Sequence, residues 1–310
     1  MKGLVLAGGL GTRLRPTTLV VNKHLLQIYE KPMIYYPLAT LIGAGISDIL
    51  VVTSPGQVDN FKELLGDGSD WGVVIDIVEQ PSPNGIGGAI LSCEDRIRDE
   101  GLCVILGDNI FTGHAMSIKL RQLINENGSR SYAFATSVTD SKSFGVVEYD
   151  DDTQKPIRIH EKPRHPPSDV IVTGLYLFRQ GLFEILGGIR PSERGQIEIT
   201  SVLNYYLKRE QLSIDRLDQC GIGLDWFDAG TPLSLNDANQ EVKRLADQRK
   251  YFGYPEVAAW RSGFIDAKRC HQLARTEKLK NSRYAQHLAG LVSIDGKTSD
   301  DDIGAEENEC

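Results

Sequence analysis

The residues best suited to chemistry lie near the start of the chain, where a short apolar run passes into a glycine turn. The run Leu4-Val5-Leu6 predicts a buried parallel strand, and Gly8, Gly9 and Gly11 follow it. Because glycine has no Cβ, the backbone can fold tightly here and bring its N–H groups close to a ligand. Arg13 adds a fixed positive charge beside those amides. Such a combination of amides and a guanidinium group suits a chain of phosphates.

Two common phosphate-binding loops do not fit this turn. A Walker A loop needs Lys and then Ser or Thr directly after its last glycine, whereas Gly11 is followed by Thr12 and Arg13. A dinucleotide-binding fingerprint needs a third glycine where Leu14 stands. A plain tight turn between strand and helix is the structural alternative, and Lys23 downstream of the arginine makes phosphate binding the better interpretation.

Two aspartates far apart in the sequence stand in motifs that could carry chemistry. Asp108 follows the apolar run 102–106, a predicted strand, and a carboxylate at the carboxyl end of a parallel strand can hold a divalent cation over a phosphate. Asp228 stands in Trp226-Phe227-Asp228-Ala229-Gly230-Thr231. Each also has an ordinary structural explanation, since Asp108 could cap the next segment and Asp228 could form a turn before glycine.

The elements that must position these residues alternate regularly in the first half of the chain. Hydrophobic patterns predict strands at 48–53, 73–78 and 102–106 and helices at 33–44, 58–65 and 86–98. This alternation predicts an α/β fold, a mostly parallel sheet with helices on both faces. Ligands bind such sheets at the carboxyl ends of the strands, so the glycine turn, residues 22–26 and the segment after residue 106 should converge.

The rest of the chain changes character. Strands are predicted at 132–138, 144–149, 157–160 and 170–178 as antiparallel additions, followed by a mostly helical segment 192–208 and short strands at 212–217 and 224–227. Helical patterns then cover 233–253 and 256–291. The acidic segment 293–310 predicts a disordered tail. We therefore expect a core at 1–232, a C-terminal helical region at 233–292, and the tail.

Composition narrows the class of protein. A chain of 310 residues with 41% hydrophobic residues can bury one sizeable core. Its net charge of −8 argues against a nucleic-acid polymer as partner, although local arginines still allow a small anionic substrate. Five scattered cysteines favour reduced thiols in a cytoplasmic protein. No segment has the length or pattern of a membrane span or a signal peptide.

Taken together, these motifs resemble the sugar-1-phosphate nucleotidyltransferases, which have a Rossmann-like core. The resemblance rests on the turn at 6–16, on Asn22-Lys23-His24-Leu25-Leu26 and on the run 31–38, which is similar to the thymidylyltransferase branch. It extends to about Leu291. It implies a nucleotide site, whose expected residues are Leu6, Gly8, Gly9, Gly11, Thr12, Arg13, Gln80, Gly85 and Asp108.

The resemblance assigns specific roles within the nucleotide site. Arg13 and the turn amides would hold the β,γ-phosphates, and Lys23 would lie near the α-phosphate. Gln80 and the backbone at Gly85, in a proline-braced loop that could otherwise be a surface turn, would contact the pyrimidine base. The sequence departs from the family pattern close by. Gly87-Gly88 replaces the usual Ala-Gln, and His24 and Gln27 replace a common Gln and Pro.

The resemblance also implies a sugar-phosphate site and a metal site. The expected sugar-phosphate residues are Gly145, Glu161, Lys162, Val172, Tyr176, Glu198 and Trp226. Lys162 would contact the phosphate of the sugar, although Glu161-Lys162-Pro163 alone also fits an exposed ion pair. Asp108 and Asp228 match the aspartates that bind Mg²⁺, and Arg13, Lys23 and Lys162 are the expected catalytic residues. Phe144 replaces a usual Tyr and Gln196 a usual Glu.

The expected activity is Mg²⁺-dependent transfer of a nucleotidyl group from dTTP to glucose 1-phosphate. Its products would be dTDP-glucose, for deoxysugar biosynthesis, and pyrophosphate. UTP or another sugar 1-phosphate remains an alternative, as do a non-catalytic sugar-nucleotide-binding regulator and a glycosyltransferase. The segments 256–266 and 284–288 are similar to the C-terminal part of tetrameric relatives, which implies a homotetramer with a second, inhibitory nucleotide site.

Overall fold

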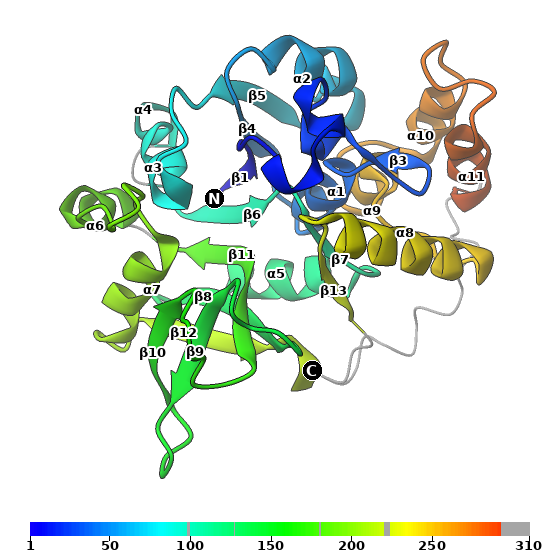
Figure 1. The fold of residues 1–310 in the computed structure, drawn as a ribbon. Coiled ribbons are helices and arrows are strands. Elements are labelled where there is room, and N and C mark those ends of the chain that lie inside the picture. The colour runs from blue at the N-terminus through cyan, green and yellow to red at the C-terminus, as the bar shows by residue number, and fades with distance from the viewer. Residues whose placement is uncertain (98–99, 127, 180, 220–223, 293–310) are drawn as a thin grey trace.

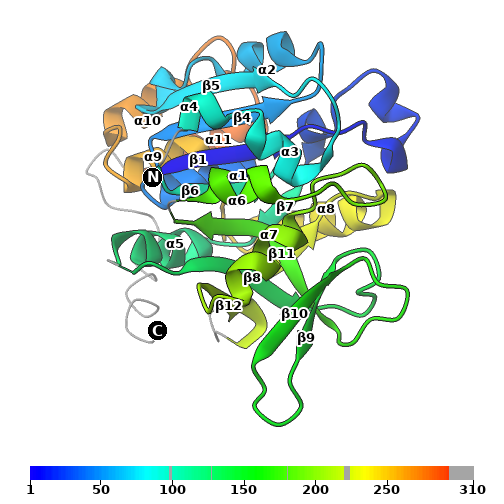
Figure 2. The ribbon, with the colours of Figure 1, turned by 90° about the vertical axis from the view of Figure 1, so that its left-hand side faces the viewer.

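A computed structural model describes residues 1–97, 100–126, 128–179, 181–219 and 224–292. One large mixed sheet runs through the middle of the molecule, with helices packed on both faces (Figures 1 and 2). The strands of this sheet, in spatial order, are β10 (Pro156–Glu161), β9 (Gly145–Tyr149), β11 (Val170–Phe178), β6 (Leu102–Leu106), β1 (Lys2–Ala7), β4 (Asp48–Thr53) and β5 (Val74–Glu79), with β8 (Ser131–Ser137) beside β11 and β12 (Leu212–Arg216) beside β8.

The direction of the strands divides the sheet in two. Strands β6, β1, β4 and β5 are parallel, as their βαβ connections require, and β11 then pairs antiparallel with β6, β8 and β9. β10 continues antiparallel beside β9, and β12 runs parallel to β8. The predicted parallel core with antiparallel additions is thus confirmed. Because β11 borders β6, the two halves meet beside the strand that leads into Asp108.

Each face of the sheet buries its own apolar core. One face packs against α1 (Tyr35–Gly43), α2 (Val58–Leu65), α5 (Ala115–Asn125), α9 (Pro255–Arg261), α10 (Ala267–Ala274) and α11 (Arg283–Leu291). The other packs against α3 (Gly85–Leu91), α4 (Glu94–Ile97), α6 (Leu182–Gly188) and α7 (Ile199–Leu207). Continuous apolar strands such as β1 and β4 are what a sheet covered on both faces needs.

A third, smaller core lies at the edge where the chain enters its C-terminal part. There α8 (Pro232–Asp247) packs against two short sheets, β13 (Trp226–Asp228) with β7 (Asn109–Phe111), and β2 (Gln27–Ile28) with β3 (Lys31–Pro32). Thr231 and Ser234 form a capping box at the start of α8. The β13–β7 pair sets Asp228 opposite Asn109, so pairing brings the two aspartates together.

The C-terminal helices complete the core of the first strand. Val257, Tyr284 and Leu288 belong to the same buried cluster as Val5 of β1, and α9 packs on α1. Helices α9, α10 and α11 thus share one buried cluster with the sheet, whereas α8 packs in the third core. The predicted tail at 293–310 lies outside the described residues.

The sequence patterns misjudged two helical segments. The predicted helix 86–98 is two helices, α3 and α4, interrupted at Ser92 and Cys93. The segment 192–208 is helical only from Ile199, because Gly195 adopts a positive φ of 70° in a loop before it. Helices α5 and α6 were not predicted. No helix in the described part of the chain has the length and apolar character needed to cross a membrane.

Candidate active site

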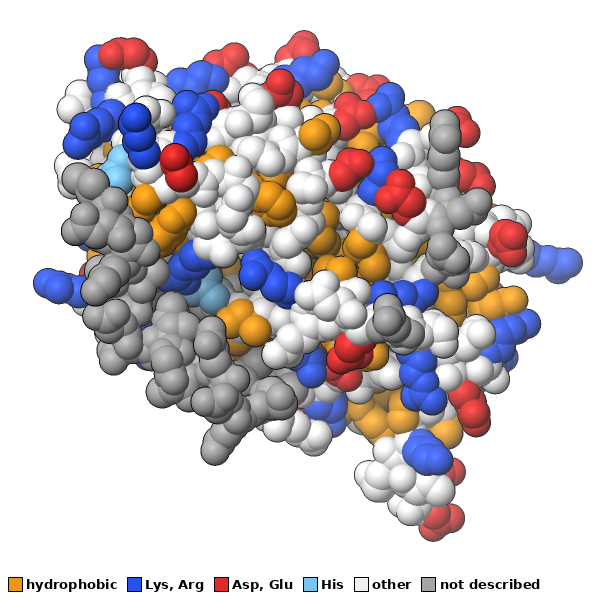
Figure 3. Space-filling view, turned by 180° about the vertical axis from the view of Figure 1, so that it is seen from behind, with side chains coloured by type: hydrophobic (Ala, Val, Ile, Leu, Met, Phe, Trp, Pro, Cys, Tyr) orange, Lys and Arg blue, Asp and Glu red, His pale blue; other side chains and the backbone are white. Residues whose placement is uncertain are grey.

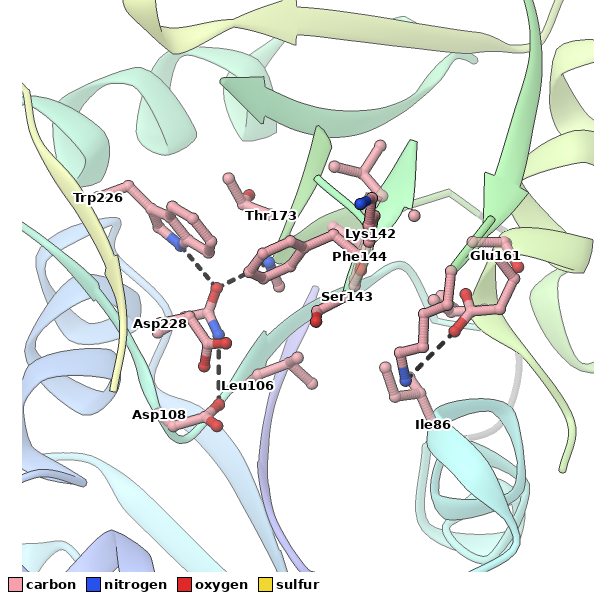
Figure 4. Close-up of a pocket in the computed structure, with 18 of the residues that line it drawn as sticks. Ile86, Leu106, Asp108, Lys142, Ser143, Phe144, Glu161, Thr173, Trp226 and Asp228 are labelled. Atoms are coloured by element: carbon pink, nitrogen blue, oxygen red, sulfur yellow. Dashed lines mark hydrogen bonds and ion pairs between the residues drawn. The ribbon is translucent and has the colours of Figure 1, made fainter. Parts of the chain in front are cut away.

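Two neighbouring cavities lie along the carboxyl ends of β1 and β6. The larger, of about 500 Å³, and the smaller, of about 250 Å³, share Ile86, Leu106 and Asp108 in their walls. The smaller cavity contains the predicted nucleotide residues Leu6, Gly8, Gly9, Gln80, Gly85 and Asp108, together with Lys23. The larger contains Arg13, Gly145, Glu161, Lys162, Val172, Tyr176, Trp226 and Asp228, with Asp108 (Figure 4). Sequence-predicted residues therefore gather in two adjoining spaces, as the strand order requires.

The glycine turn bends as predicted. Gly9 has φ 101° and Gly11 has φ 55°, values that favour glycine, and a Cβ on Gly11 would come within 2.9 Å of Thr18. The turn leads into a short 3₁₀ helix, Thr12–Leu14. Gly11 and the exposed Thr12 line neither cavity. Arg13 instead reaches the far side of the site, where a Cβ on Gly230 would lie 2.5 Å from its guanidinium group.

The two aspartates and Lys23 form the charged centre of the site. Lys23 makes an ion pair with Asp108, and both side chains are largely buried. Burial opposes the charge of Asp108, but the charge of Lys23 and hydrogen bonds from Lys23 and Asn109 outweigh it, so the pKa of Asp108 lies well below its usual range. Burial and then the charge of Asp108 raise the pKa of Asp228 to about 6, although Lys23 and Arg13 oppose this rise. A buried carboxylate whose negative charge is disfavoured by a second carboxylate beside it, as Asp228 is by Asp108, suits a cation site.

Asn109 joins three parts of this centre. Its Oδ1 accepts hydrogen bonds from the Trp226 indole at 2.7 Å and from the Gly174 backbone at 2.8 Å, and its Nδ2 donates to Asp108 at 3.2 Å. It is only 2% exposed. Figure 4 shows these contacts meeting between Trp226 and Asp108. Asn109 therefore fixes Asp108 relative to the sugar side of the site. Sequence reasoning gave Asn109 no role.

An arginine that sequence reasoning missed organises the sugar side. Arg194 reaches Glu161 Oε1 at 3.1 Å and Glu198 Oε1 at 3.0 Å, and Ser192 donates to the same Glu198 oxygen at 2.9 Å. Glu198, an expected sugar-phosphate residue, is 9% exposed and lines neither cavity, so it meets Glu161 only through Arg194. The available signal in the sequence was the spacing of Arg194 and Glu198, which are four residues apart. Because the segment between them is a loop rather than a helix, that spacing alone did not predict their contact.

The walls of the larger cavity combine an aromatic pair with a lysine on a strained backbone. The rings of Phe144 and Trp226 meet edge to face with centroids 5.7 Å apart. Lys162 has a φ of 44°, unusual for a residue with a Cβ, and its N–H donates to the Phe144 carbonyl at 2.9 Å. Its ammonium group lies 3.5 Å from Glu161 (Figure 4). The backbone thus turns this lysine toward the cavity, where an anionic group could be held.

The residues that line the smaller cavity around Lys23 are held by side-chain hydrogen bonds. Asn22 donates to the Ala7 carbonyl at 3.2 Å and accepts from the backbone and the ring of His24, each at 2.9 Å. Burial and then the charge of Lys23 lower the pKa of His24 to about 3, so its ring is neutral. A Cβ on Gly107 would lie 2.6 Å from that ring, and this close approach explains the glycine before Asp108.

Comparison with known proteins assigns the class. A family model described as nucleotidyl transferase matches residues 2–244. The chain belongs to this family, which confirms the resemblance seen in the glycine turn and its partner motifs. It is 41% identical over 293 residues to a glucose-1-phosphate thymidylyltransferase from Neisseria meningitidis serogroup A, covering 94% of this chain and 99% of the relative. A protein of the same name from Mycolicibacterium smegmatis is 42% identical over 294 residues, with the same coverage.

Solved structures agree with this assignment. A UDP-glucose pyrophosphorylase solved with UDP-glucose has a TM-score of 0.67 and 25% sequence identity, and the match covers 78% of this chain and 98% of that one. A Bacillus anthracis protein described as a glucose-1-phosphate thymidylyltransferase, solved with sucrose, has a TM-score of 0.70 at 37% identity, covering 78% and 94%. The predicted fold class is thus confirmed.

Proposed function

We propose that this protein transfers a thymidylyl group from dTTP to glucose 1-phosphate, giving dTDP-glucose for deoxysugar biosynthesis and pyrophosphate. The observation that carries the proposal is the pair of adjoining cavities that share Asp108, with Lys23 in one and Lys162 in the other. A triphosphate in the smaller space and a sugar phosphate in the larger would meet at the charged centre. The two named relatives support the choice of base and sugar.

The chemistry needs no general base. A phosphate oxygen of the sugar 1-phosphate, already anionic, forms a bond to the α-phosphorus, while the bond from that phosphorus to the bridging oxygen of the β-phosphate breaks and pyrophosphate leaves. The work of the protein is therefore to position two anions in line and to neutralise their charge. A half-exposed Lys162 would hold the entering phosphate, and a buried Lys23 would stabilise charge near the α-phosphoryl group.

Arg13 and the turn amides have a different task in this mechanism. We assign them to the β,γ-phosphates, which leave as pyrophosphate. In the structure Arg13 lies beside Asp228 and Gly230. Its side chain is exposed, so it could reach a phosphate bound over the glycine turn. A bidentate guanidinium group suits a phosphate leaving with increased negative charge.

Asp108 and Asp228 would hold Mg²⁺. No cluster of three or more candidate ligands occurs among the described residues, but Mg²⁺ commonly takes one or two protein carboxylates and completes its shell with substrate phosphates and water. The raised pKa of Asp228 beside Asp108 is the electrostatic condition that such a cation would relieve. When bound, the ion would withdraw charge from the α-phosphate.

Release of pyrophosphate tests the proposal. The protein should release it only when a nucleoside triphosphate, a sugar 1-phosphate and Mg²⁺ are all present, and dTTP with glucose 1-phosphate should give the highest kcat/KM in a panel of bases and sugars. UTP belongs in that panel because one structural relative is a UDP-glucose pyrophosphorylase. Binding of dTDP-glucose without any turnover would instead identify a regulator. Transfer of sugar from dTDP-glucose to an acceptor would identify a glycosyltransferase.

We also propose a cytoplasmic homotetramer assembled through the C-terminal helices, with a second nucleotide site that inhibits. Trp260, Phe264 and Ile265 are only half-buried against the chain's own core, which leaves their outer surfaces for a partner. On the face opposite that of Figure 1, hydrophobic side chains lie in small groups between charged ones (Figure 3). Light scattering of the purified protein should give four times the chain mass, whereas a monomer at micromolar concentration would refute the assembly.

A further inference from the structure

We propose that Asn84 is the positioning residue for base selection. Asn84 holds the side-chain amide of Gln80 so that the Oε1 atom of Gln80 is available beside the smaller cavity. Gly88 leaves the space that the Asn84 side chain needs. The selection is for pyrimidines that carry an N3–H, uracil and thymine, against cytosine. This inference rests on the proposed function only in taking the smaller cavity as the site of the nucleotide base.

The hydrogen bond between the two amides fixes the orientation of Gln80. The Gln80 side chain follows β5, is 8% exposed, and donates from Nε2 to Asn84 Oδ1 at 2.8 Å. Its Oε1 faces the glycine turn, because a Cβ added to Gly8 would come within 3.0 Å of that oxygen. Gln80 and Gly8 both line the smaller cavity. The acceptor end of the Gln80 amide therefore remains available beside the cavity.

The backbone of Asn84 is itself held in place from both sides. Its N–H donates to the Ser82 carbonyl at 2.9 Å, and its carbonyl accepts from the N–H of Ile197 at 2.9 Å. Gly87 then donates to the Ile197 carbonyl at 2.9 Å. The loop is thus fastened to the segment that precedes α7, so the backbone of residue 84 should keep its position when the Asn84 side chain is replaced.

Gly88 makes the arrangement possible. A Cβ at position 88 would lie 2.0 Å from Asn84 Oδ1 and 2.2 Å from Asn84 Cγ, separations that no pair of unbonded atoms can adopt. The Asn84 side chain therefore fills the space that a side chain at 88 would take. Position 88 is where the sequence departs from the Gln of the family pattern, and the amide at 84 occupies that space in this chain.

The remaining hydrogen-bonding capacity of Gln80 determines which base fits. One Nε2 hydrogen is taken by Asn84, which leaves Oε1 as an acceptor and the second Nε2 hydrogen as a donor. Thymine and uracil offer N3–H and an adjacent carbonyl, which match that pair. Cytosine presents an unprotonated N3 and an amino group in the same places, so it would face acceptor with acceptor and donor with donor. A buried mismatch of this kind is how polar sites reject a close analogue.

The test is the ratio of kcat/KM for dTTP to that for dCTP, with glucose 1-phosphate as the second substrate. Asn84→Ala should lower this ratio about fivefold, the effect of one neutral hydrogen bond. Asn84→Asp should keep it, because a carboxylate can only accept and so holds Gln80 in the same orientation. Gly88→Ala should lower it as Asn84→Ala does, and the double variant should be no worse than Asn84→Ala alone. Ser82→Ala, an exposed change in the same loop, is the control and should leave the ratio unchanged.

Each outcome decides the inference. Unchanged ratios in Asn84→Ala and Gly88→Ala would overturn it, and so would an Asn84→Asp ratio as low as that of Asn84→Ala. Dissociation constants for dTTP and dCTP, measured by calorimetry, give the same ratio without turnover. If the wild type releases no pyrophosphate with any triphosphate, the proposed function fails while the binding ratio still tests Asn84. Thermal melting identifies a variant that does not fold, and the two Asn84 variants suffice if Gly88→Ala is lost.

Discussion

Replacing Lys23 or Lys162 with alanine should affect different substrates, because the two ammonium groups have different surroundings. The Lys23 side chain is 14% exposed and is paired with an Asp108 side chain that is 10% exposed. The Lys162 side chain is 47% exposed and lies 3.5 Å from Glu161. The first is a buried ion pair in the charged centre. The second is a solvated cation at the rim of the larger cavity.

The expected magnitudes follow from this burial. Lys23→Ala leaves a buried carboxylate without its main cation, a change that typically costs about 3–5 kcal/mol. If that cost is expressed fully in the reaction, it is a loss of about 10²–10⁴ in kcat, with a raised KM for dTTP. A charge-assisted contact is worth about 1.5–3 kcal/mol, and solvent screening reduces this for Lys162. Lys162→Ala should therefore raise the KM for glucose 1-phosphate about five- to tenfold and leave the KM for dTTP unchanged.

Initial rates of pyrophosphate release, with each substrate varied in turn, measure both effects. Lys155→Ala is the matched control, since it removes the same charge from an exposed position near the tip of the β9–β10 hairpin and should change neither KM. Melting temperatures separate loss of folding from loss of chemistry. If the two variants changed both KM values alike, or if Lys162→Ala lowered kcat more than Lys23→Ala, the assignment of the two lysines would be wrong.

Three further perturbations test other parts of the site. Asp108→Asn and Asp228→Asn should each lower kcat on the order of a hundredfold, with losses that do not add in the double variant, and near-normal turnover in both would exclude the two-aspartate metal site. Arg194→Ala removes the bridge between Glu161 and Glu198 and should raise the KM for glucose 1-phosphate about fivefold. Arg190→Ala, a change at an exposed neighbouring position, is the control and should leave this KM unchanged. A selective rise in the KM for dTTP in Arg194→Ala would contradict the prediction. Burial lowers the pKa of Lys31 from 10.5 to about 8, so between these values the unfolded chain binds more protons at this lysine, which therefore contributes up to about 3 kcal/mol of stability as pH rises. Buried cysteines with raised pKa values act in the opposite direction, so the test is a difference: from pH 7.5 to pH 10, urea unfolding should show the wild type gaining on Lys31→Met.

The sequence predicted well those features that depend on local pattern. Strands β4, β6 and β11 begin and end where their apolar runs do, because a strand covered on both faces must be apolar throughout. The convergence of the glycine turn and Asp108 followed from the parallel order of β1 and β6. Motifs that lie at strand ends are therefore accessible to sequence reasoning, since topology alone places them together.

What the sequence could not predict depends on contacts between distant segments. Arg194 joins Glu161 to Glu198 across a loop of no regular pattern, and Asn109 bridges β7, β11 and β13 through one amide. Neither residue type signals such a bridging role, because Arg and Asn are also common at ordinary surface positions. The space that Asn84 fills beside Gly88 exists only once α3 has formed. These partners become visible only when the fold is known.

The shared core of β1 and the C-terminal helices has a consequence for synthesis of the chain. Val5 is among the first residues to leave the ribosome, yet its buried cluster includes Tyr284, Leu288 and Val292, which are among the last described. Helices α1, α2 and α5 cover the strands themselves, but the side of α1 that packs on α9 must wait for nearly the whole chain before it is covered. Until then it is exposed to other nascent chains and to chaperones. Premature termination before α9 leaves that side of α1 open, so such truncated products should be aggregation-prone and rapidly degraded rather than partly active.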